Sequence, residues 1–500
     1  MRTSLEGRRF DVLVIGGGIT GAGVARDAAM RGLEVALVEK NDFASGTSSR
    51  SSRLVHGGIR YLEYAQVGLV RESVRERETL LRIAPHLVHP LEFTWPVYRK
   101  ARISRTKLRF ALAVYNVLAG RVSFPHIESR VAARNREPLL NADGLHGAAI
   151  YTDAATDDCR LTLANILAAN DAGALTVNHA EAVRPISRDR DHWVVKVHDA
   201  ALNADFEVKA TVIVNATGPW RLNLERRWPQ HRAQRRGSKG VHIALPRECI
   251  GNRGALTILS PDDGRVMFIL PSGDFTIVGT TDTWTDESPD EVRASEADIA
   301  YLLRAANSYF PEAKASEADV VSAWAGIRPL ADWDPDRNPS EFSREHRINR
   351  NGAGMITVSG GKLTTYRAMA AEIVDAVEHE LGRKPTRCTT AEVDLPGAER
   401  SAALAEMISA EPASGARVVP DLPYTIAELR YAVKFEMALT LSDLLMRRTR
   451  IAFETPDHGA RAAPAAADAV SGIAGWDKHR IRAQIDAYID DAARVFAIEG

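Results

Sequence analysis

The sequence predicts an α/β protein with a helical C-terminal domain, and three observations lead to this prediction. The first forty residues read as strand, glycine turn, helix and strand. Residues 177–281 are rich in strand patterns, and the last hundred residues show the apolar spacing of helices. We therefore expect an α/β domain, a strand-rich domain interleaved with it, and an all-helical C-terminal domain.

Length and charge exclude several classes of protein. At roughly 150 residues per domain, 500 residues predict two to four domains. Lys and Arg total 64 against 65 Asp and Glu, which leaves a formal charge of −1 and argues against a nucleic-acid-binding protein. Cys159, Cys249 and Cys388 lie far apart in the sequence, so neither a disulfide framework nor a metal site is expected.

The pattern of apolar residues predicts no membrane-spanning segment. The longest nearly apolar run, residues 110–119, is ten residues long, whereas a spanning helix needs roughly 20. The N-terminal apolar stretch runs into glycines without a small-residue cleavage site. We expect a cytoplasmic protein, for which peripheral membrane association stays possible.

The N-terminal unit carries a dinucleotide-binding fingerprint. A β-branched strand over residues 10–15 leads into the glycines Gly16, Gly18 and Gly21, which open a helix, and Glu39 ends the second strand. In this context the glycines allow a tight turn, the helix N-terminus meets a pyrophosphate, and the carboxylate accepts from a ribose hydroxyl. The unit is therefore predicted to be Rossmann-like.

A cluster of hydroxyls favours FAD over NAD as the cofactor. Residues 45–52 contain six Ser or Thr side chains directly after the second strand, where an extended ribityl and diphosphate would lie. NAD enzymes rarely need such a loop. The predicted cofactor contacts in it are Thr47, Ser48 and Ser49.

The remainder of the chain suggests further elements. We expect a long charged helix over residues 61–83, antiparallel strands over 177–218, and a strand, glycines and a helix over 355–381. The helical patterns at 426–448 and 477–498 are separated by an Ala/Pro/Gly stretch, residues 456–475, which is predicted to be a loop or weak linker.

Residues 99–121 form an unusual basic segment. The segment has seven basic residues and no acidic one around an apolar centre that includes Phe110, Leu112, Val114, Val117 and Leu118. The segment is compatible with an interfacial membrane element. It is equally compatible with a buried helix that is preceded by solvent-exposed basic residues. The arginines Arg447, Arg448 and Arg450 are the next candidates for membrane contact.

Eight segments together resemble one known family, the FAD-dependent glycerol-3-phosphate dehydrogenases of the aerobic respiratory type, in the D-amino-acid-oxidase-like flavoprotein superfamily. The most specific are Leu54-Val-His-Gly-Gly-Ile-Arg-Tyr-Leu-Glu63 and Ser359-Gly-Gly-Lys-Leu-Thr-Thr-Tyr-Arg367. The others are residues 15–23, 47–49, 84–87, 214–220, 277–282 and 326–330. They occur in the family's order.

The resemblance implies domains, ligands and a location. The FAD-binding domain would comprise residues 8–85, 150–235 and 325–395, the substrate or cap domain 86–149 and 236–324, and the helical domain 396–500. The implied reaction oxidises sn-glycerol 3-phosphate to dihydroxyacetone phosphate by hydride transfer to dissociable FAD and passes the electrons to a membrane quinone. The enzyme would lie peripherally on the inner face of the plasma membrane, and a homodimer is considered.

The resemblance also implies roles for individual residues. Arg60 and Arg328 would hold the phosphate or other substrate oxygens with Tyr61 as a further donor, and His56 would be the general base unless Arg328 organises proton removal through water. Lys362 would lie near flavin and substrate. Asp282 is interpreted as closing a turn. The remaining cofactor contacts implied are Gly218, Gly360, Gly361, Lys362, Leu363 and Thr364.

Two other functions stay open at this point. An oxidase of the same family would pass the electrons to oxygen. Family oxidases commonly carry an extra insertion in the cap region, and this chain shows no obvious one. A flavoprotein that uses FAD only for structure or sensing would not need His56, Arg60, Arg328 and Lys362.

Overall fold

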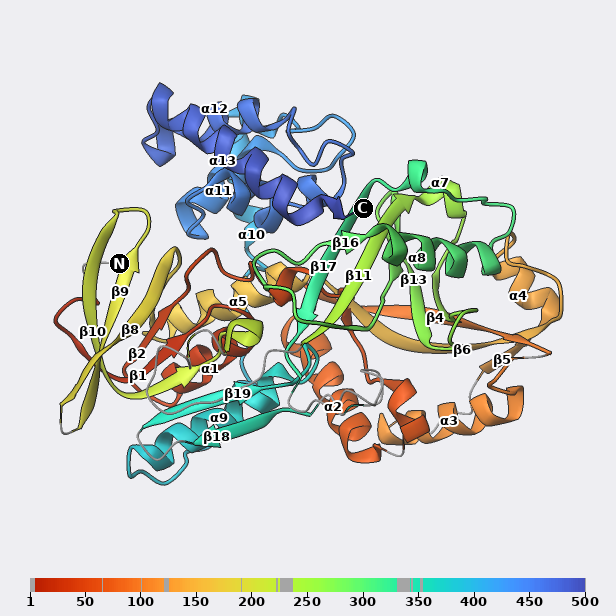
Figure 1. Cartoon of the computed structure of the whole chain (residues 1–500), viewed down its shortest axis with the longest axis horizontal. Helices are drawn as coiled ribbons and strands as arrows, with labels where there is room; N and C mark the ends of the chain where they lie inside the picture. The colour runs from red at the N-terminus through yellow and green to blue at the C-terminus, as the bar shows by residue number, and fades with distance from the viewer. Residues whose placement is uncertain are drawn as a thin grey trace.

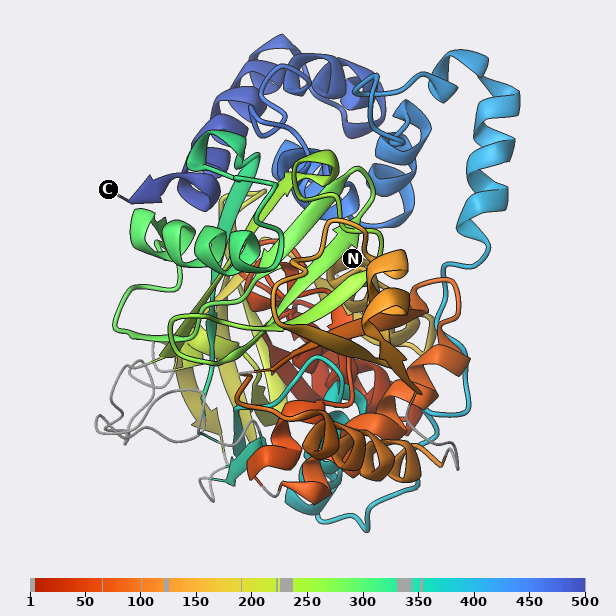
Figure 2. The ribbon, with the colours of Figure 1, turned by 90° about the vertical axis from the view of Figure 1, so that its right-hand side faces the viewer.

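The described part of the chain folds into two large β-sheets, one two-stranded sheet and a C-terminal helical domain (Figures 1 and 2). The computed structural model describes residues 5–64, 66–99, 101–120, 126–189, 191–221, 224, 237–330, 342, 345–350 and 354–499. The predicted fold class is confirmed. Among the helices of these segments, none combines the length and apolarity needed to cross a bilayer.

The first sheet is the Rossmann-like sheet predicted from the N-terminal unit. Its central strands β19, β10, β1, β2 and β7 are parallel, and where they meet at the centre of the sheet they consist mostly of buried β-branched and aliphatic residues. Helix α1 packs against α5 and α9. Along the sheet the order is β18 (Arg347–Arg350), β19 (Met355–Ser359), β10 (Ala204–Asn215), β1 (Arg9–Ile15), β2 (Val35–Val38) and β7 (Leu175–Val177), with β9 (His192–Asp199) and β8 (Ala180–Asp189) extending β10. The helices are α1 (Ile19–Met30), α5 (Asp158–Asp171) and α9 (Tyr366–Glu380).

The second sheet is mostly antiparallel and belongs to the strand-rich part of the chain. Its order is β15 (Thr283–Thr285), β11 (Gly237–Pro246), β14 (Phe275–Gly279), β13 (Val266–Ser272), β12 (Ala255–Leu259), β4 (Val88–Tyr98), β6 (Leu145–Thr156) and β3 (Leu54–Val55), with β17 (Ser322–Arg328) on β11 and β5 (His126–Ser129) on β6. The accompanying helices are α2 (Val67–Ile83), α3 (Arg105–Leu118), α4 (Arg130–Arg136), α7 (Arg247–Ile250) and α8 (Glu296–Tyr309).

Three details differ from the predicted elements. The helix expected over residues 61–83 begins as a 3₁₀ turn, Ile59–Tyr64, and continues as α2 only from Val67. Strands β6 and β17 belong to the second sheet although they cross the predicted domain bounds at 149/150 and 324/325. An apolar strand pattern shows that a strand is buried but not which sheet it joins. The other domain bounds stay a prediction.

The C-terminal domain is helical, but the position of one helix was wrongly predicted. The stretch over residues 456–475 contains helix α12, and the pattern over 426–448 is split into α11 and a π-helical turn. Alanine has the highest helix propensity, and the proline in α12 stands in its first turn, where no amide donor is lost. The elements are α10 (Arg400–Ala410), α11 (Ile426–Phe435), the π-helical turn Asp443–Arg448, α12 (Ala463–Ala474), α13 (Lys478–Phe496) and β20 (Ile498–Glu499), which pairs with β16 (Ala294–Ser295).

Buried ion pairs attach the helical domain to the first sheet. Arg447 and Arg448 both donate to Asp42, which follows β2, and Arg450 donates to Asp158 at the start of α5. The side chains of these arginines are 11%, 2% and 5% exposed. The alternative of a membrane contact through these arginines is therefore wrong, because their charges are used inside the protein.

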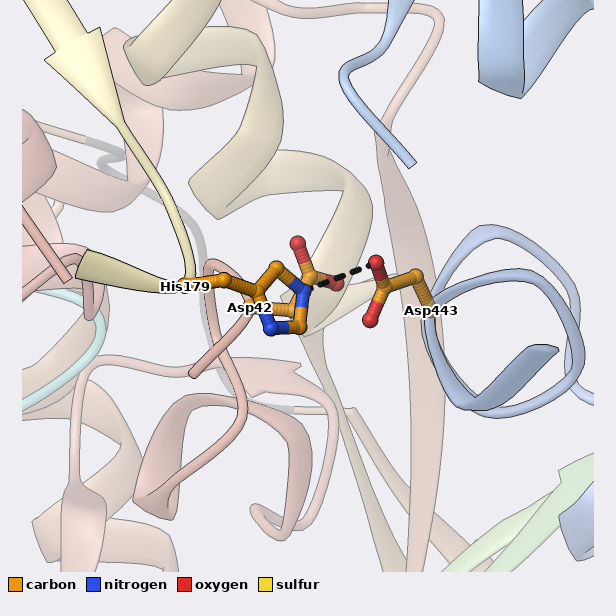
Figure 3. A group of neighbouring side chains, drawn as sticks. All are labelled: Asp42, His179 and Asp443. Carbon is orange, nitrogen blue, oxygen red and sulfur yellow. Dashed lines mark hydrogen bonds and ion pairs between the residues drawn. The ribbon is translucent and has the colours of Figure 1, made fainter. Parts of the chain in front are cut away.

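A histidine belongs to the same network. Figure 3 shows the imidazole of His179 beside the carboxylates of Asp42 and Asp443, with its Nε2 atom 3.0 Å from an oxygen of Asp443. Burial opposes a charge on His179, but the Asp443 carboxylate outweighs this, so the pKa of His179 is raised. Arg447 and Arg448 already compensate the two carboxylates, which makes the group an ion-pair network rather than a metal site.

We predict that His179→Gln destabilises the protein in a pH-dependent way. A raised pKa means that protonated His179 contributes stability below its unfolded pKa of about 6.5, and that this contribution disappears as the pH rises through the folded value. Urea unfolding should show a loss of about 1 kcal/mol near pH 6 and a much smaller loss at alkaline pH. The exposed His146→Gln is the control. A loss that does not depend on pH would contradict the prediction.

Candidate functional site

A cavity of about 500 Å³ lies between the two sheets. Its walls come from the ends of β1, β2 and β10, the segment from residue 45 to residue 61, strands β11 and β17, and the loop after β19. Every predicted site residue lines this cavity except Gly21 and Ser49. The cavity therefore brings together residues that are more than three hundred positions apart in the sequence.

The glycine turn after β1 is shaped to leave backbone amides exposed to the cavity. Gly16 has a φ of +109°, and a Cβ on Gly21 would lie 1.9 Å from the Gly16 carbonyl oxygen, so both positions exclude larger residues. Gly18 is the N-cap of α1 and offers no side chain to its amides. The Ser48 hydroxyl accepts from the Ile19 amide at 2.9 Å. This N-terminus can receive a pyrophosphate.

Glu39 ends β2 at the same end of the cavity. Its carboxylate accepts from the Gly17 amide at 2.7 Å and from the Asn41 amide at 2.9 Å. Burial raises the pKa of Glu39, and these two amides oppose the shift. The hydrogen bonds fix the orientation of the carboxylate while it lines the cavity, as the predicted ribose contact requires.

The hydroxyl-rich loop is held in place from β17. Thr47 donates to the carbonyl of Ile327 at 2.7 Å, and Ser49 donates to the carbonyl of Gly46, which turns Ser49 away from the cavity. Across the cavity, Gly218 has a φ of +58°, and a Cβ there would meet no atom within 4 Å. The space beside Gly218 is therefore open to a ligand.

Cationic side chains gather around Tyr61 at the other end of the cavity. The Nζ atom of Lys362 lies 3.8 Å from the centre of the Tyr61 ring, and Arg60 donates to the Tyr61 hydroxyl at 3.0 Å. Burial, followed by Lys362 and Arg60, lowers the pKa of His56 to about 3. His56 is therefore neutral at physiological pH and can accept a proton.

The loop after β19 positions Lys362 and His56 relative to each other. Gly360 and Gly361 have φ values of +73° and +98°, which carry the chain around to the start of α9. The Thr364 hydroxyl accepts from the His56 amide at 3.1 Å and lies 3.2 Å from the His56 carbonyl oxygen. Leu363 adds an apolar side chain to the wall.

Arg328 is held by a buried carboxylate. Its guanidinium lies 3.1 Å from Asp282 and donates to the Thr280 hydroxyl at 3.0 Å. Asp282 is 4% exposed and also accepts from Ser238. The interpretation of Asp282 as a residue that only closes a turn is therefore wrong, because its carboxylate fixes the orientation of Arg328.

A second histidine, His242, lines the cavity and was missed in the sequence. It lies on β11, where its ring stacks on Trp324 and its Nε2 atom is 2.9 Å from the Ser52 hydroxyl oxygen. Burial, followed by Arg328 and Arg53, lowers its pKa to about 3. Its only signal in the sequence is a polar residue inside an apolar strand pattern.

A buried carboxylate anchors the loop that carries His56. Asp153 on β6 is 3% exposed and contacts Arg77 and the Tyr115 hydroxyl, each at 2.5 Å. The same carboxylate accepts from the Gly57 amide at 3.0 Å. Helix α2, helix α3 and the loop therefore all meet at one side chain.

Comparison with known proteins identifies the fold and the cofactor. Residues 11–367 match the model of the family described as FAD dependent oxidoreductase, and residues 397–481 match the C-terminal domain of alpha-glycerophosphate oxidase. The chain belongs to the FAD-dependent oxidoreductase family. The glycine turn, Glu39 and the open space beside Gly218 fit FAD, which is the cofactor of this family.

The similar proteins are consistent in their names. A glycerol-3-phosphate dehydrogenase from Mycobacterium leprae is 38% identical over 518 residues, which cover 96% of this chain and 87% of the relative. The aerobic glycerol-3-phosphate dehydrogenase from Staphylococcus saprophyticus is 37% identical over 409 residues, which cover 80% of this chain and 73% of the relative. The structure of glycerol-3-phosphate dehydrogenase from Bacillus halodurans, solved with FAD, has a TM-score of 0.79 and 29% identity over 98% of this chain and 96% of that one.

We predict that this FAD-dependent oxidoreductase depends on Asp153 for stability. Asp153→Ala removes the buried partner of Arg77, which keeps its ion pair with Glu78, and leaves the Tyr115 hydroxyl and the Gly57 amide without their acceptor. These losses should together cost about 3 kcal/mol. Urea unfolding of the holoprotein should show a loss of this size, whereas Asp205→Ala, which removes an exposed ion pair, should change little. A loss for Asp153→Ala as small as that of the control would contradict the anchoring role.

Proposed function

We propose that this protein oxidises sn-glycerol 3-phosphate to dihydroxyacetone phosphate and passes the electrons to a membrane quinone. The observation that carries the proposal is the polar end of the cavity, where Arg60, Arg328 and Lys362 lie close to the neutral histidines His56 and His242. A phosphate dianion needs paired cationic donors in a desolvated site, and an alcohol needs a proton acceptor. The names of the relatives support the same substrate.

The hydrogen-bond donors at the polar end of the cavity define how the substrate would bind. Arg60 and Arg328 hold the phosphate or other substrate oxygens, with Tyr61 as a further donor. The ion pair between Arg328 and Asp282 orients the guanidinium before the substrate arrives, so little ordering is needed on binding. Lys362 lies near both flavin and substrate.

The reaction requires removal of a proton and a hydride from the same secondary alcohol. When bound, FAD would supply the acceptor for the hydride of the carbinol carbon. His56 or His242 accepts the hydroxyl proton, or Arg328 directs it to water, and the C–O bond becomes a carbonyl. The amides of Gly360 and Gly361 and the N-terminus of the following helix would hold the pyrimidine side of the flavin and would offer it positive partial charge.

The direct test is reduction of the flavin without oxygen. Adding sn-glycerol 3-phosphate to the oxidised holoprotein should bleach its visible absorbance, because the electrons have no other acceptor, and glycerol should not. Absorbance that persists would overturn the proposed reaction and favour a sensing flavoprotein. Reoxidation by a soluble quinone but only slowly by oxygen would distinguish the dehydrogenase from the oxidase.

We predict that Arg328→Ala weakens substrate binding and spares the cofactor. Loss of a charge-assisted pair in a desolvated site costs about 2–4 kcal/mol. Steady-state kinetics should show this as a lower kcat/KM, while FAD content after dialysis stays at the wild-type level. The exposed Arg304→Ala, on the second sheet's helix α8, is the control. Unchanged KM and kcat for Arg328→Ala would contradict the phosphate role.

The basic segment supports peripheral membrane association. Helix α3 lies at the opposite end of the molecule from the helical domain in both views (Figures 1 and 2). Phe110 and Val117 are 73% and 66% exposed, and the basic side chains of Arg99, Arg102, Arg105, Lys107 and Arg109 face solvent. Lys100 and Arg121 lie outside the described residues. Leu112 is 1% exposed and packs inside, so its predicted place at an interface is wrong. Exposed apolar and basic groups together suit an anionic lipid surface.

We predict that replacing Arg102, Arg105, Lys107 and Arg109 with glutamine reduces binding to anionic liposomes. Each cation near such a surface contributes about 1 kcal/mol. Vesicle sedimentation at low salt should show the loss, and quinone-linked turnover should fall while turnover with a soluble dye is kept. The control variant replaces the exposed basic residues Arg461, Lys478, Arg480 and Arg482. Equal liposome binding by both variants would remove α3 as the anchor.

A further inference from the structure

A second cavity, of about 520 Å³, lies where the two sheets and the helical domain meet. Its walls come from α5, β4, β13, β14, the linker that precedes α10, and α11 with the segment after the π-helical turn. Ser52 and Leu54 line both this cavity and the first one. One short stretch of chain therefore separates the two cavities. A volume of this size suits a small organic ligand.

The arginines in the wall of the second cavity form ion pairs with one exception among the described residues, while two of its carboxylates, Glu399 and Glu454, accept only from the Gly397 amide and the Tyr424 hydroxyl. Four arginines in its wall contact carboxylates: Arg160 and Arg400 with Glu436, Arg448 with Asp42, and Arg450 with Asp157 and Asp158. Within the described part of the chain, Arg53 in the same wall has no carboxylate at ion-pair distance. A guanidinium in this position attracts an anion.

The hydrogen bonds of Arg53 leave much of its guanidinium unused. Its Nη1 atom donates to the Ser272 hydroxyl at a long 3.3 Å, and its Nε atom is shielded from water without any acceptor. The guanidinium carbon lies 5.6 Å and 5.4 Å from the ring centres of Trp324 and Phe453. Burial, followed by Arg450, lowers the pKa of Arg53. An acceptor oxygen in the cavity would relieve this cost.

The acidic groups closest to Arg53 are engaged elsewhere. Asp157 and Asp158 accept from Arg450 at 2.7 Å and 2.5 Å, and Glu454 accepts from the Tyr424 hydroxyl at 3.0 Å. They moderate the positive potential around Arg53 without forming an ion pair with it. The apolar wall of the cavity, Leu91, Leu270 and Ile277, suits the carbon part of a ligand.

The residues flanking Arg53 contact the first cavity. Ser52 forms a hydrogen bond with His242 at 2.9 Å, and Ser51 donates to Asp158, which also holds Arg450 of the helical domain. A shift of Arg53 toward a ligand would therefore move the hydroxyl that orients His242. The path from Arg53 through Ser52 to His242 therefore connects the second cavity to the first.

We propose that the second cavity is a regulatory site for a small organic anion, whose carboxylate or phosphate binds Arg53 and whose carbon chain contacts the apolar wall. Occupancy changes turnover in the first cavity through Ser52 and His242. The helical domain forms part of the site, which gives that domain a role in the enzyme.

The binding experiment uses the FAD-loaded full chain under anaerobic conditions, with sn-glycerol 3-phosphate saturating the first cavity. Hexanoate, hexyl phosphate and hexan-1-ol are titrated by calorimetry. We expect saturable binding of one or both anions and much weaker binding of the alcohol, because only the anions can pair with Arg53. The anion that binds more tightly identifies the headgroup chemistry.

Two variants locate the binding. Arg53→Met should weaken it by about tenfold or more, the scale of a charge-assisted hydrogen bond. Ser401→Trp at the exposed mouth of the cavity should block it without disturbing the core. Arg461→Met, which removes a 94% exposed arginine, is the control. Absence of saturable anion binding, or equal binding by all variants, would overturn the site.

Regulation is tested separately by turnover with a soluble dye. The anion that binds should change kcat or KM by about fivefold in the wild type and in Arg461→Met, but not in Ser401→Trp. Binding without any kinetic effect would overturn the regulatory role. Because calorimetry does not depend on turnover, failure of the proposed dehydrogenase reaction would leave the binding result readable.

Discussion

The carboxylate of Asp153 is the constraint on which the arrangement of the site depends. It is buried between the second sheet and helices α2 and α3, and it accepts from Arg77, Tyr115 and the Gly57 amide. A buried charge is tolerated only when its partners are fixed around it. The loop from His56 to Tyr61 therefore has one position relative to the sheet, and the cationic end of the cavity is built on that position.

The same principle attaches the helical domain. Arg447 and Arg448 pair with Asp42, which follows β2, and Arg450 pairs with Asp158 at the start of α5. Both carboxylates belong to the first sheet and the helices packed on it. These contacts place the helical domain beside Asp158, whose carboxylate also accepts from the Ser51 hydroxyl. In a linear sequence such arginines look like surface charges, because nothing local indicates the carboxylates that receive them.

Local backbone demands explain what could be predicted from the sequence. Gly16, Gly21 and Glu39 could be assigned because a strand, a tight turn and a helix start impose residue types at fixed spacing, and the loop from Ser359 to Thr364 has the same kind of signal. His242 and Asp282 could not. His242 reaches the cavity through strand pairing, in which it lies opposite Trp324 on β17 and Gly279 on β14, and that register is set by tertiary packing. Asp282 acts through Arg328, which comes from a distant strand, β17.

The electrostatics of the cationic end tie substrate binding to proton transfer in the proposed reaction. Burial and the neighbouring cations hold both histidines neutral, with pKa values of about 3, which makes them weak bases when no anion compensates those cations. A phosphate dianion beside Arg60, Lys362 and Arg328 would compensate those cations and so raise both values toward the ordinary value of about 6.5. The proton acceptor would thus become a stronger base only when the substrate is in place, and the burial that keeps it neutral would also keep water from competing for the hydroxyl.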